Sequence, residues 1–229
     1  MKKSVLVIAA HPDDEVLGCG GTIARLVSEG IQVNVVIAAQ GITSRRDIAE
    51  EQMHRELELL RNQSQEAHKK LGVTSTFFLD FPDNKLDTIP LLDLVWEIER
   101  IIKIANPGSI YTHQSSDVNV DHQRLHEAVL AATRPQPGNS ILETFYFEIP
   151  SSTEWRFSRD SLNFSPNYFV DITNFIDNKI DALKSYESEM KPHPHPRSYV
   201  SVERLSEWRG SIIGVSNAEA FEVGRIIRN

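Results

Sequence analysis

Long apolar runs are the clearest pattern in the first 150 residues. Residues 4–10 (SVLVIAA) form a near-continuous apolar run that is rich in β-branched residues and shows no polar alternation, and residues 32–39 (QVNVVIAA) form a second, largely apolar run. Such runs are typical of strands that are buried on both faces of a parallel sheet. Similar but shorter runs predict further strands at 74–80, 109–113 and 142–149. The pattern therefore predicts at least five strands.

Helical segments lie between these strands. They are predicted at 22–29, 47–70, 88–105 and 121–133, where apolar residues recur at helical spacing or helix-ending residues follow. The sequence GCGG at 18–21 is predicted to be a turn that leads into the first helix. Strands that alternate with helices indicate an α/β fold with a Rossmann-like, doubly wound and mainly parallel sheet, covered by helices on both faces.

The regular alternation of predicted strands and helices ends after residue 150. A short strand and three helices are predicted there, at 168–172, 174–190, 202–213 and 217–227. The Pro-rich segment 191–197 is expected to be a rigid, extended loop. We therefore predict one domain over residues 1–229, with a Rossmann-like core at 1–150 and a C-terminal helical extension at 151–229 that carries substrate loops.

Composition narrows the class of protein. The formal net charge of −8 argues against nucleic acid or an anionic membrane as the main partner, because both need a basic surface. No apolar run reaches the roughly 18 residues of a membrane span, and the start of the chain lacks a small-residue cleavage site. We therefore expect a cytoplasmic protein without membrane insertion. A homo-oligomer is compatible with the long polar helix and the C-terminal extension.

Ionisable side chains follow two of the predicted strands. The first strand ends in His11-Pro12-Asp13-Asp14-Glu15. The fourth strand is followed by a second cluster, which comprises His113, Asp117, Asn119, Asp121, His122 and His126. Ligands of open α/β sheets bind beyond the carboxyl ends of the strands, where the strand order reverses. Because the first and fourth strands flank this point, we expect the two clusters to meet.

Two imidazoles and one carboxylate from these clusters form a metal-binding set. His11, Asp14 and His122 would leave coordination positions open, as in catalytic zinc sites. The same set also suits ferrous iron, cobalt or manganese. Asp13 is placed to act as a general base. Asp121 could orient a ligand histidine, cap the helix that begins there, or do both.

The motifs resemble those of the PIG-L or LmbE-like family of zinc-dependent N-acetyl-sugar deacetylases. The resemblance rests on residues 10–15 (AHPDDE), 18–21 (GCGG) and 117–122 (DVNVDH), and extends to 194–198, 209–210 and 218–221. It implies that His11, Asp14 and His122 bind zinc and that Asp13 is the general base. The implied reaction is hydrolysis of an acetamide on an N-acetylglucosamine-type sugar or conjugate, which releases acetate and a free amine.

One position departs from the family pattern. Many members have a histidine three residues before the last ligand, whereas this chain has Asn119. An Asn amide donates a hydrogen bond to an oxyanion but supplies no proton. His113 or His195 is a candidate for the missing acid, and His113 has the alternative role of a strand-end histidine held by local hydrogen bonds.

Further residues are candidates for contacts around the metal ligands and with substrate. Glu15 is expected to lie next to the metal ligands without binding the metal itself. Contacts with substrate are predicted for Arg61, Arg45, Glu148, Trp155 and Arg197. The arginines would suit an anionic carrier, and Trp155 would suit stacking on a sugar ring. Cys19 is expected to be a small buried residue rather than a ligand, and three histidines (His54, His68 and His193) are expected on the surface.

Two other functions remain open at this point. The metal chemistry alone would also serve a hydrolase of a non-sugar amide or ester. A non-enzymatic, small-molecule-binding protein on a Rossmann-like sheet is the third hypothesis. The first loop lacks Gly-x-Gly-x-x-Gly directly after the strand, which disfavours a dinucleotide site.

Overall fold

The computed structural model describes residues 4–42, 49–138, 140–157 and 163–228. Within these residues seven strands form a single sheet. They are β1 (Ser4–Ala9), β2 (Gln32–Ala39), β3 (Ser75–Phe81), β4 (Ser109–His113), β5 (Glu143–Phe147), β6 (Tyr168–Asp171) and β7 (Ala218–Ile226). The helices of the same residues are α1 (Asp14–Ser28), α2 (Glu50–Leu71), α3 (Leu91–Ala105), α4 (Val120–Ala132), α5 (Ile176–Leu183) and α6 (Tyr199–Ile213), with short 3-10 turns η1 (Leu86–Thr88), η2 (Thr153–Trp155) and η3 (Lys184–Tyr186).

The sheet confirms the predicted α/β fold. Its strand order is β3-β2-β1-β4-β5-β7-β6, and the first five strands in this order are parallel. The chain runs outward from β1 to β3 on one side and from β4 to β5 on the other. The order therefore reverses between β1 and β4, as predicted, and the loops that follow these two strands lie side by side.

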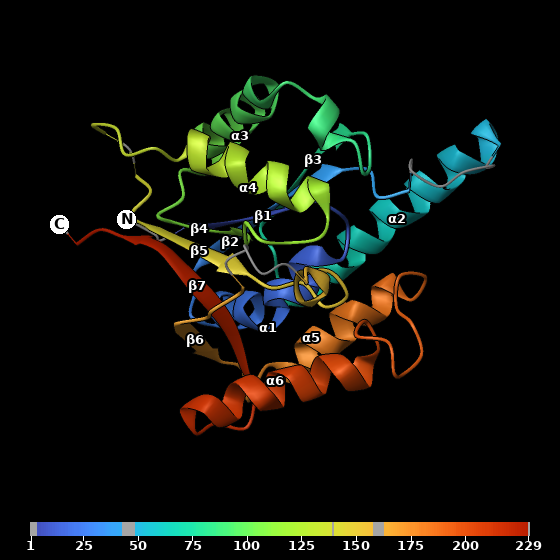
Figure 1. Ribbon diagram of the computed structural model, residues 1–229, viewed down its shortest axis with the longest axis vertical. Coiled ribbons are helices and arrows are strands. Elements are labelled where there is room, and N and C mark those ends of the chain that lie inside the picture. Colours follow the sequence, from blue (N-terminus) through green and yellow to red (C-terminus); the bar gives the residue numbers. More distant parts are fainter. Residues whose placement is uncertain (1–3, 43–48, 139, 158–162, 229) are drawn as a thin grey trace.

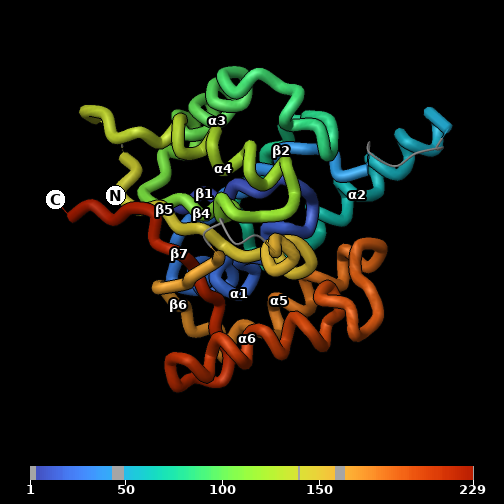
Figure 2. Tube along the Cα trace, in the orientation of Figure 1, coloured from blue at the N-terminus to red at the C-terminus, as the bar shows by residue number. Residues whose placement is uncertain are grey.

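Helices cover both faces of the sheet (Figure 1). On one face, α3 and α4 pack over Leu6 and Ile8 of β1. On the other face, α1, α2, α5 and α6 enclose a second core that includes Val7 and Ala9. Successive residues of β1 thus enter opposite cores, which is why the strand has no polar alternation. The N-terminal turns of α2 extend beyond the body of the molecule (Figure 2).

The helix predicted at 217–227 is wrong, because this segment forms β7. β7 pairs antiparallel with β5 on one side and β6 on the other, so the C-terminal segment completes the sheet. Ala and Glu favour helices, and they misled the prediction. Tertiary contacts decide the outcome: Phe221 is fully buried in the core, and Glu219 is 5% exposed with buried hydrogen bonds.

The predicted turn at 18–21 is also wrong, because α1 begins earlier, at Asp14, and includes these residues. The glycines serve close packing of the helix on its neighbours. A Cβ atom on Gly18 would lie 2.6 Å from the Phe147 ring, and one on Gly21 would lie 2.7 Å from Ile172. Both separations are too short for real side-chain contacts, so only glycine lets α1 lie this close to the sheet.

A buried ion pair is inserted into α1 at a kink. Cys19 has non-helical dihedral angles (φ −149°, ψ 26°), which interrupts the hydrogen-bond ladder of the helix. Lys179 of α5 donates to the Leu17 carbonyl at 2.8 Å and to Glu219 at 2.6 Å. The Glu219 carboxylate accepts from the backbone N–H groups of Gly21 and Thr22 at 3.0 and 2.7 Å. The pair thereby satisfies backbone groups on both sides of the kink.

No helix in the described part of the chain has the length and apolar character needed to cross a membrane.

Candidate active site

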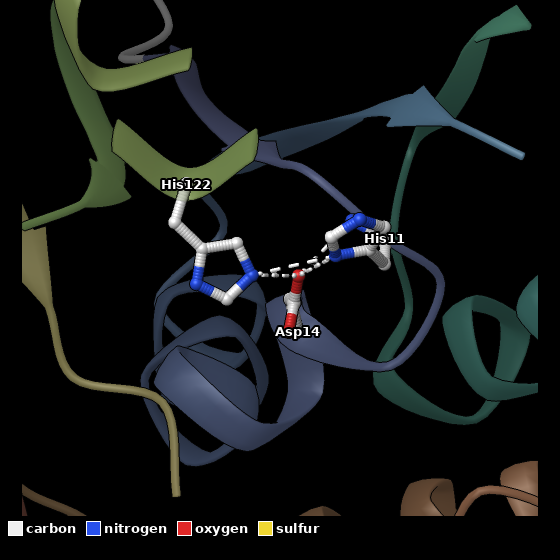
Figure 3. A group of neighbouring side chains, drawn as sticks. All are labelled: His11, Asp14 and His122. Atoms are coloured by element: carbon white, nitrogen blue, oxygen red, sulfur yellow. Dashed lines mark hydrogen bonds and ion pairs between the residues drawn. The ribbon is translucent and has the colours of Figure 1, made fainter. Parts of the chain in front are cut away.

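Three predicted metal ligands converge at the carboxyl ends of β1 and β4 (Figure 3). His11 lies in the short loop after β1, Asp14 opens α1, and His122 lies in the first turn of α4. The strand order brings residues 11 and 122 together although 111 residues separate them in the sequence. The prediction that the two clusters meet is confirmed.

The three donor atoms form a nearly equilateral triangle. His11 Nδ1 lies 3.1 Å from Asp14 Oδ2 and 3.3 Å from His122 Nε2, and the distance from His122 Nε2 to Asp14 Oδ2 is 3.1 Å. Ligands at the 2.0–2.2 Å of zinc sites lie roughly 3.3 Å apart in a tetrahedral arrangement. The Asp14 Oδ1 atom is buried and has no hydrogen-bond partner among the described residues. The donor set therefore fits a divalent metal ion.

Three carboxylates contact the ligand histidines from outside the triangle. One of them, Asp83, has its Oδ1 atom 3.1 Å from His11 Nε2. Asp121 Oδ2 lies 3.0 Å from His11 Nε2, so the predicted contact of Asp121 with a ligand histidine is present. Asp121 also accepts from the backbone N–H groups of Asn84 and Leu86. Asp117 Oδ2 lies 3.1 Å from His122 Nδ1. A carboxylate on the second ring nitrogen fixes the tautomer and orientation of a metal-binding histidine.

Asp117 belongs to the second ionisable cluster, but its contact with a ligand histidine was not predicted. Asp117 accepts hydrogen bonds from Ser152, from Thr153 at 2.8 Å and from the backbone of Asn119 at 2.8 Å. Burial acts to raise the pKa of Asp117, but the hydrogen bond and charge of His122, together with the hydrogen bonds from Ser152 and the Asn119 backbone, lower this pKa to about 2. The residue is therefore anionic at neutral pH. The position of Asp117 in the turn just before His122 was the sequence feature that could have predicted this contact.

Asp13, the predicted base, lies beside the triangle in a strained backbone conformation. Its φ is 103°, a region that non-glycine residues rarely adopt. Its side chain is almost fully buried, and Oδ1 has no hydrogen-bond partner within the described residues. Burial raises the pKa of Asp13 well above its usual range, and the nearby Arg197 guanidinium opposes this shift. A raised pKa suits a carboxyl group that must take up and return a proton.

Arg197 connects the C-terminal loop to this carboxylate. Its Nη1 atom donates to Asp13 Oδ2 at 2.7 Å, and Nε donates to Ser151 Oγ at 2.9 Å. A cavity of about 210 Å³ opens here, lined by Asp13, Arg197 and Asn119 among others. A carboxyl group, a guanidinium group and His11 of the triangle thus line one opening, which is an arrangement suited to hydrolysis of a polar bond.

Comparison with known proteins now identifies the family. The family model described as PIG-L, GlcNAc-PI de-N-acetylase, matches residues 6–133, which include all three proposed ligands and Asp13. The chain belongs to the PIG-L family. The resemblance seen in the motifs, and the prediction of a deacetylase, are confirmed at this level.

Two relatives of this PIG-L family member, each 31% identical to it, are named as deacetylases. An uncharacterized deacetylase, YaiS, of Escherichia coli K12 is 31% identical over 193 residues, which cover 82% of this chain and 92% of the relative. The diacetylchitobiose deacetylase of Thermococcus kodakarensis is 31% identical over 199 residues, with 82% and 70% of the two chains covered. The solved N,N'-diacetylchitobiose deacetylase of Pyrococcus horikoshii has the same fold, with a TM-score of 0.77 at 22% identity over 97% of this chain and 84% of that one.

Asn119 occupies the position of the family histidine and caps α4. Its side-chain oxygen accepts from the Asp121 N–H at 2.8 Å, so only its NH₂ group remains for a substrate. The cap predicts a stability effect: Asn119→Ala should lower the free energy of unfolding by about 1 kcal/mol, measured by urea denaturation. Asn119→Ser retains a capping oxygen and should lose little. An equal loss in both variants would contradict the capping role.

The two candidate acids occupy different environments. His113 is fully buried at the end of β4, where its Nε2 accepts from the Ala10 N–H at 2.8 Å and its ring stacks on His122. This is the local hydrogen bond expected of a strand-end histidine. His195 packs edge-on against Trp155, and its Nδ1 accepts from the Arg197 N–H at 3.1 Å. His195 therefore lies next to the residue that contacts Asp13.

The predicted substrate-binding residues spread over several surfaces. Arg61 is half exposed, pairs with Asp80 and lies over the Phe78 ring. Glu148 accepts two hydrogen bonds from Arg209, at 2.8 and 2.7 Å. Trp155 is 44% exposed. Arg45 lies outside the described residues.

The prediction that His68 is a surface residue is wrong. His68 is 3% exposed, and its Nε2 lies 3.0 Å from Glu15 Oε1. Its helix, α2, is polar over most of its length, which concealed the single face that packs against the core. Glu15 is itself fully buried, and its Oε2 accepts from the Asp13 N–H at 3.1 Å. Glu15 thus contacts the Asp13 backbone, and within the described residues the expectation that it lies against the metal ligands is not met. Cys19 is buried as predicted.

Proposed function

We propose that the protein is a metal-dependent hydrolase that removes the N-acetyl group from an N-acetylglucosamine-type sugar or sugar conjugate. The observation that carries this proposal is the ligand triangle with Asp13 beside it. Two features of the relatives support it: the family description names a GlcNAc derivative, and the Thermococcus relative is named for an N-acetylated disaccharide. Neither a nucleic acid nor a membrane partner is part of the proposal.

His11, Asp14 and His122 would hold the metal ion. Zinc at this position would supply a Lewis acid that polarises the acetamide carbonyl and lowers the pKa of water. Ferrous iron, cobalt or manganese would suit the same three donors. The low pKa of Asp117 and its contact with His122 keep that imidazole oriented toward the triangle.

Asp13 would act first as the general base and then as the general acid of the reaction. Its carboxylate accepts the proton of the attacking water as the new C–O bond forms. The protonated carboxyl group then donates this proton to the amide nitrogen as the C–N bond breaks, so acetate and a sugar amine leave. The raised pKa of Asp13 favours this return. Asp13 alone can carry this proton from the water to the amide nitrogen, so the reaction requires neither the buried His113 nor another acid.

The cavity residues would bind the substrate. The Asn119 NH₂ group is proposed to donate to the oxygen that becomes negatively charged. Arg197 is proposed to hold Asp13 until substrate enters and to contact a sugar hydroxyl or an anionic group afterwards. The exposed Trp155 beside His195 is proposed to stack on the sugar ring. Arg61, Glu148 and Arg45 are proposed to contact the more distant part of a conjugate.

The proposal is tested by amine release from a panel of N-acetylhexosamines, free and linked to a nucleotide, a lipid-like group or a thiol conjugate. We expect release from at least one member, its abolition by a chelator, and its recovery when zinc is added back. Metal bound to the protein with no release from any member would remove acetamido sugars and favour a non-sugar amide or ester.

The ligand set is tested by metal analysis. Wild-type protein should hold about one ion per chain, and His122→Ala should hold much less because one of three donors is lost. His126→Ala is the matched control, since His126 lies one helical turn away and its Nδ1 contacts the His113 carbonyl instead. Full metal occupancy and full activity in His122→Ala would exclude the proposed ligand set.

A further inference from the structure

The backbone of Asp13 needs support to keep its unusual conformation. A non-glycine residue at φ 103° is strained and persists only where its surroundings hold it. The Asp13 N–H donates to Glu15 Oε2 at 3.1 Å. This hydrogen bond fixes the peptide plane from which the Asp13 side chain extends. The Glu15 carboxylate therefore positions the Asp13 backbone, while Arg197 contacts the Asp13 carboxylate directly.

Two side chains from distant elements hold the Glu15 carboxylate in turn. The Tyr186 hydroxyl, from η3, donates to Glu15 Oε1 at 2.6 Å. The His68 ring, from α2, lies with Nε2 at 3.0 Å from the same oxygen. His68 Nδ1 lies 2.7 Å from the Thr76 hydroxyl, so a ring that carries its proton on Nε2 satisfies both contacts. Glu15, His68 and Tyr186 are all buried, so water does not replace a hydrogen-bond donor that Glu15 loses.

We propose that His68 and Tyr186 are positioning residues for the catalytic base. Their hydrogen bonds fix the Glu15 carboxylate, which in turn accepts a hydrogen bond from the Asp13 N–H. The fixed Asp13 backbone then orients the Asp13 carboxylate toward the reacting bond. Within the described residues, neither His68 nor Tyr186 contacts His11, Asp14 or His122. The inference rests on the proposed function, because it takes Asp13 as the base. Misplacement of a reacting group by about 1 Å can cost on the order of 100-fold in rate, so the support has a measurable effect.

Tyr186→Phe is the first test, since it removes one O–H group and keeps the buried ring. We expect kcat to fall about tenfold or more, with KM changed less than about twofold and with metal content unchanged. Tyr168→Phe is the control, because it removes a tyrosine hydroxyl from β6 at the edge of the sheet. His68→Leu should reproduce the loss, and His68→Gln, which restores an N–H donor, should recover part of it.

A double-mutant comparison separates positioning from a general structural role. In an Asp13→Asn background the base is gone, so Tyr186→Phe should cause less than about twofold further loss. A structural role would instead lower the residual rate by the same factor in both backgrounds. Equal factors, or an unchanged kcat in both Tyr186→Phe and His68→Leu, would overturn the inference.

A second readout does not depend on turnover. The amide proton resonance of Asp13 reports its hydrogen bond to Glu15. It should shift and exchange faster with solvent in Tyr186→Phe and His68→Leu, but not in Tyr168→Phe. An unchanged resonance would overturn the inference. If wild-type protein releases no amine from any substrate, the proposed function fails while this measurement still tests the support of Asp13.

Discussion

Asp13→Asn is expected to lower kcat by roughly 10²- to 10⁴-fold, the range that general acid–base catalysis contributes. The Asn amide has nearly the same shape but cannot accept the proton of water or return it to the leaving amine. Metal content should stay at the wild-type level, because the ligand triangle consists of His11, Asp14 and His122. The measurement pairs kcat, from amine release, with metal analysis of the same sample.

Asp177→Asn serves as the control for this change. It removes the same charge from an exposed position at the start of α5 and should leave kcat unchanged. Two outcomes would contradict the assignment of Asp13. One is loss of metal in Asp13→Asn, which would make the residue a ligand. The other is a kcat within about twofold of wild type, which would move the base elsewhere.

Lys179→Met is expected to lower the free energy of unfolding by about 3–5 kcal/mol. The substitution leaves the Glu219 carboxylate buried without its counter-charge and the Leu17 carbonyl without its donor. For a chain of this size, the loss corresponds to a fall in Tm of roughly 6–20 °C. Urea denaturation and thermal unfolding both measure it.

Two further variants make this test specific. Glu97→Gln breaks an ion pair with Arg100 on the exposed surface of α3, and should cost less than about 1 kcal/mol. Adding Glu219→Gln to Lys179→Met removes the uncompensated charge and should restore part of the lost stability. A loss in Lys179→Met no larger than that in Glu97→Gln would show that the pair does not stabilise the kink.

The parts of the fold that follow from local pattern could be predicted from the sequence. The strands β1 and β2 are buried on both faces over nearly all of their length, so most of their residues are apolar and they are recognisable as strands. The reversal between β1 and β4 then follows from the alternation of strands and helices. The meeting of His11 and His122 depended on this topology rather than on any spacing in the sequence.

The parts that depend on distant partners could not be predicted. Glu219 looks like a surface residue of a helix until Lys179 and the kinked α1 are placed around it. His68 looks exposed on a polar helix until Glu15, 53 residues earlier, is placed beside it. In both cases a buried polar residue becomes favourable only when its partner is present, and the sequence does not show which partner that is.

The position of these partners along the chain has a consequence for biosynthesis. The proposed metal ligands have all been made once the ribosome has completed residue 122. The groups that secure the helix carrying Asp14, and the arginine that contacts Asp13, come from residues 179–219. A nascent chain thus acquires its ligands well before it acquires Lys179, Arg197 and Glu219. Termination between residues 122 and 179 would therefore yield a product that has every proposed ligand but lacks all three of these residues.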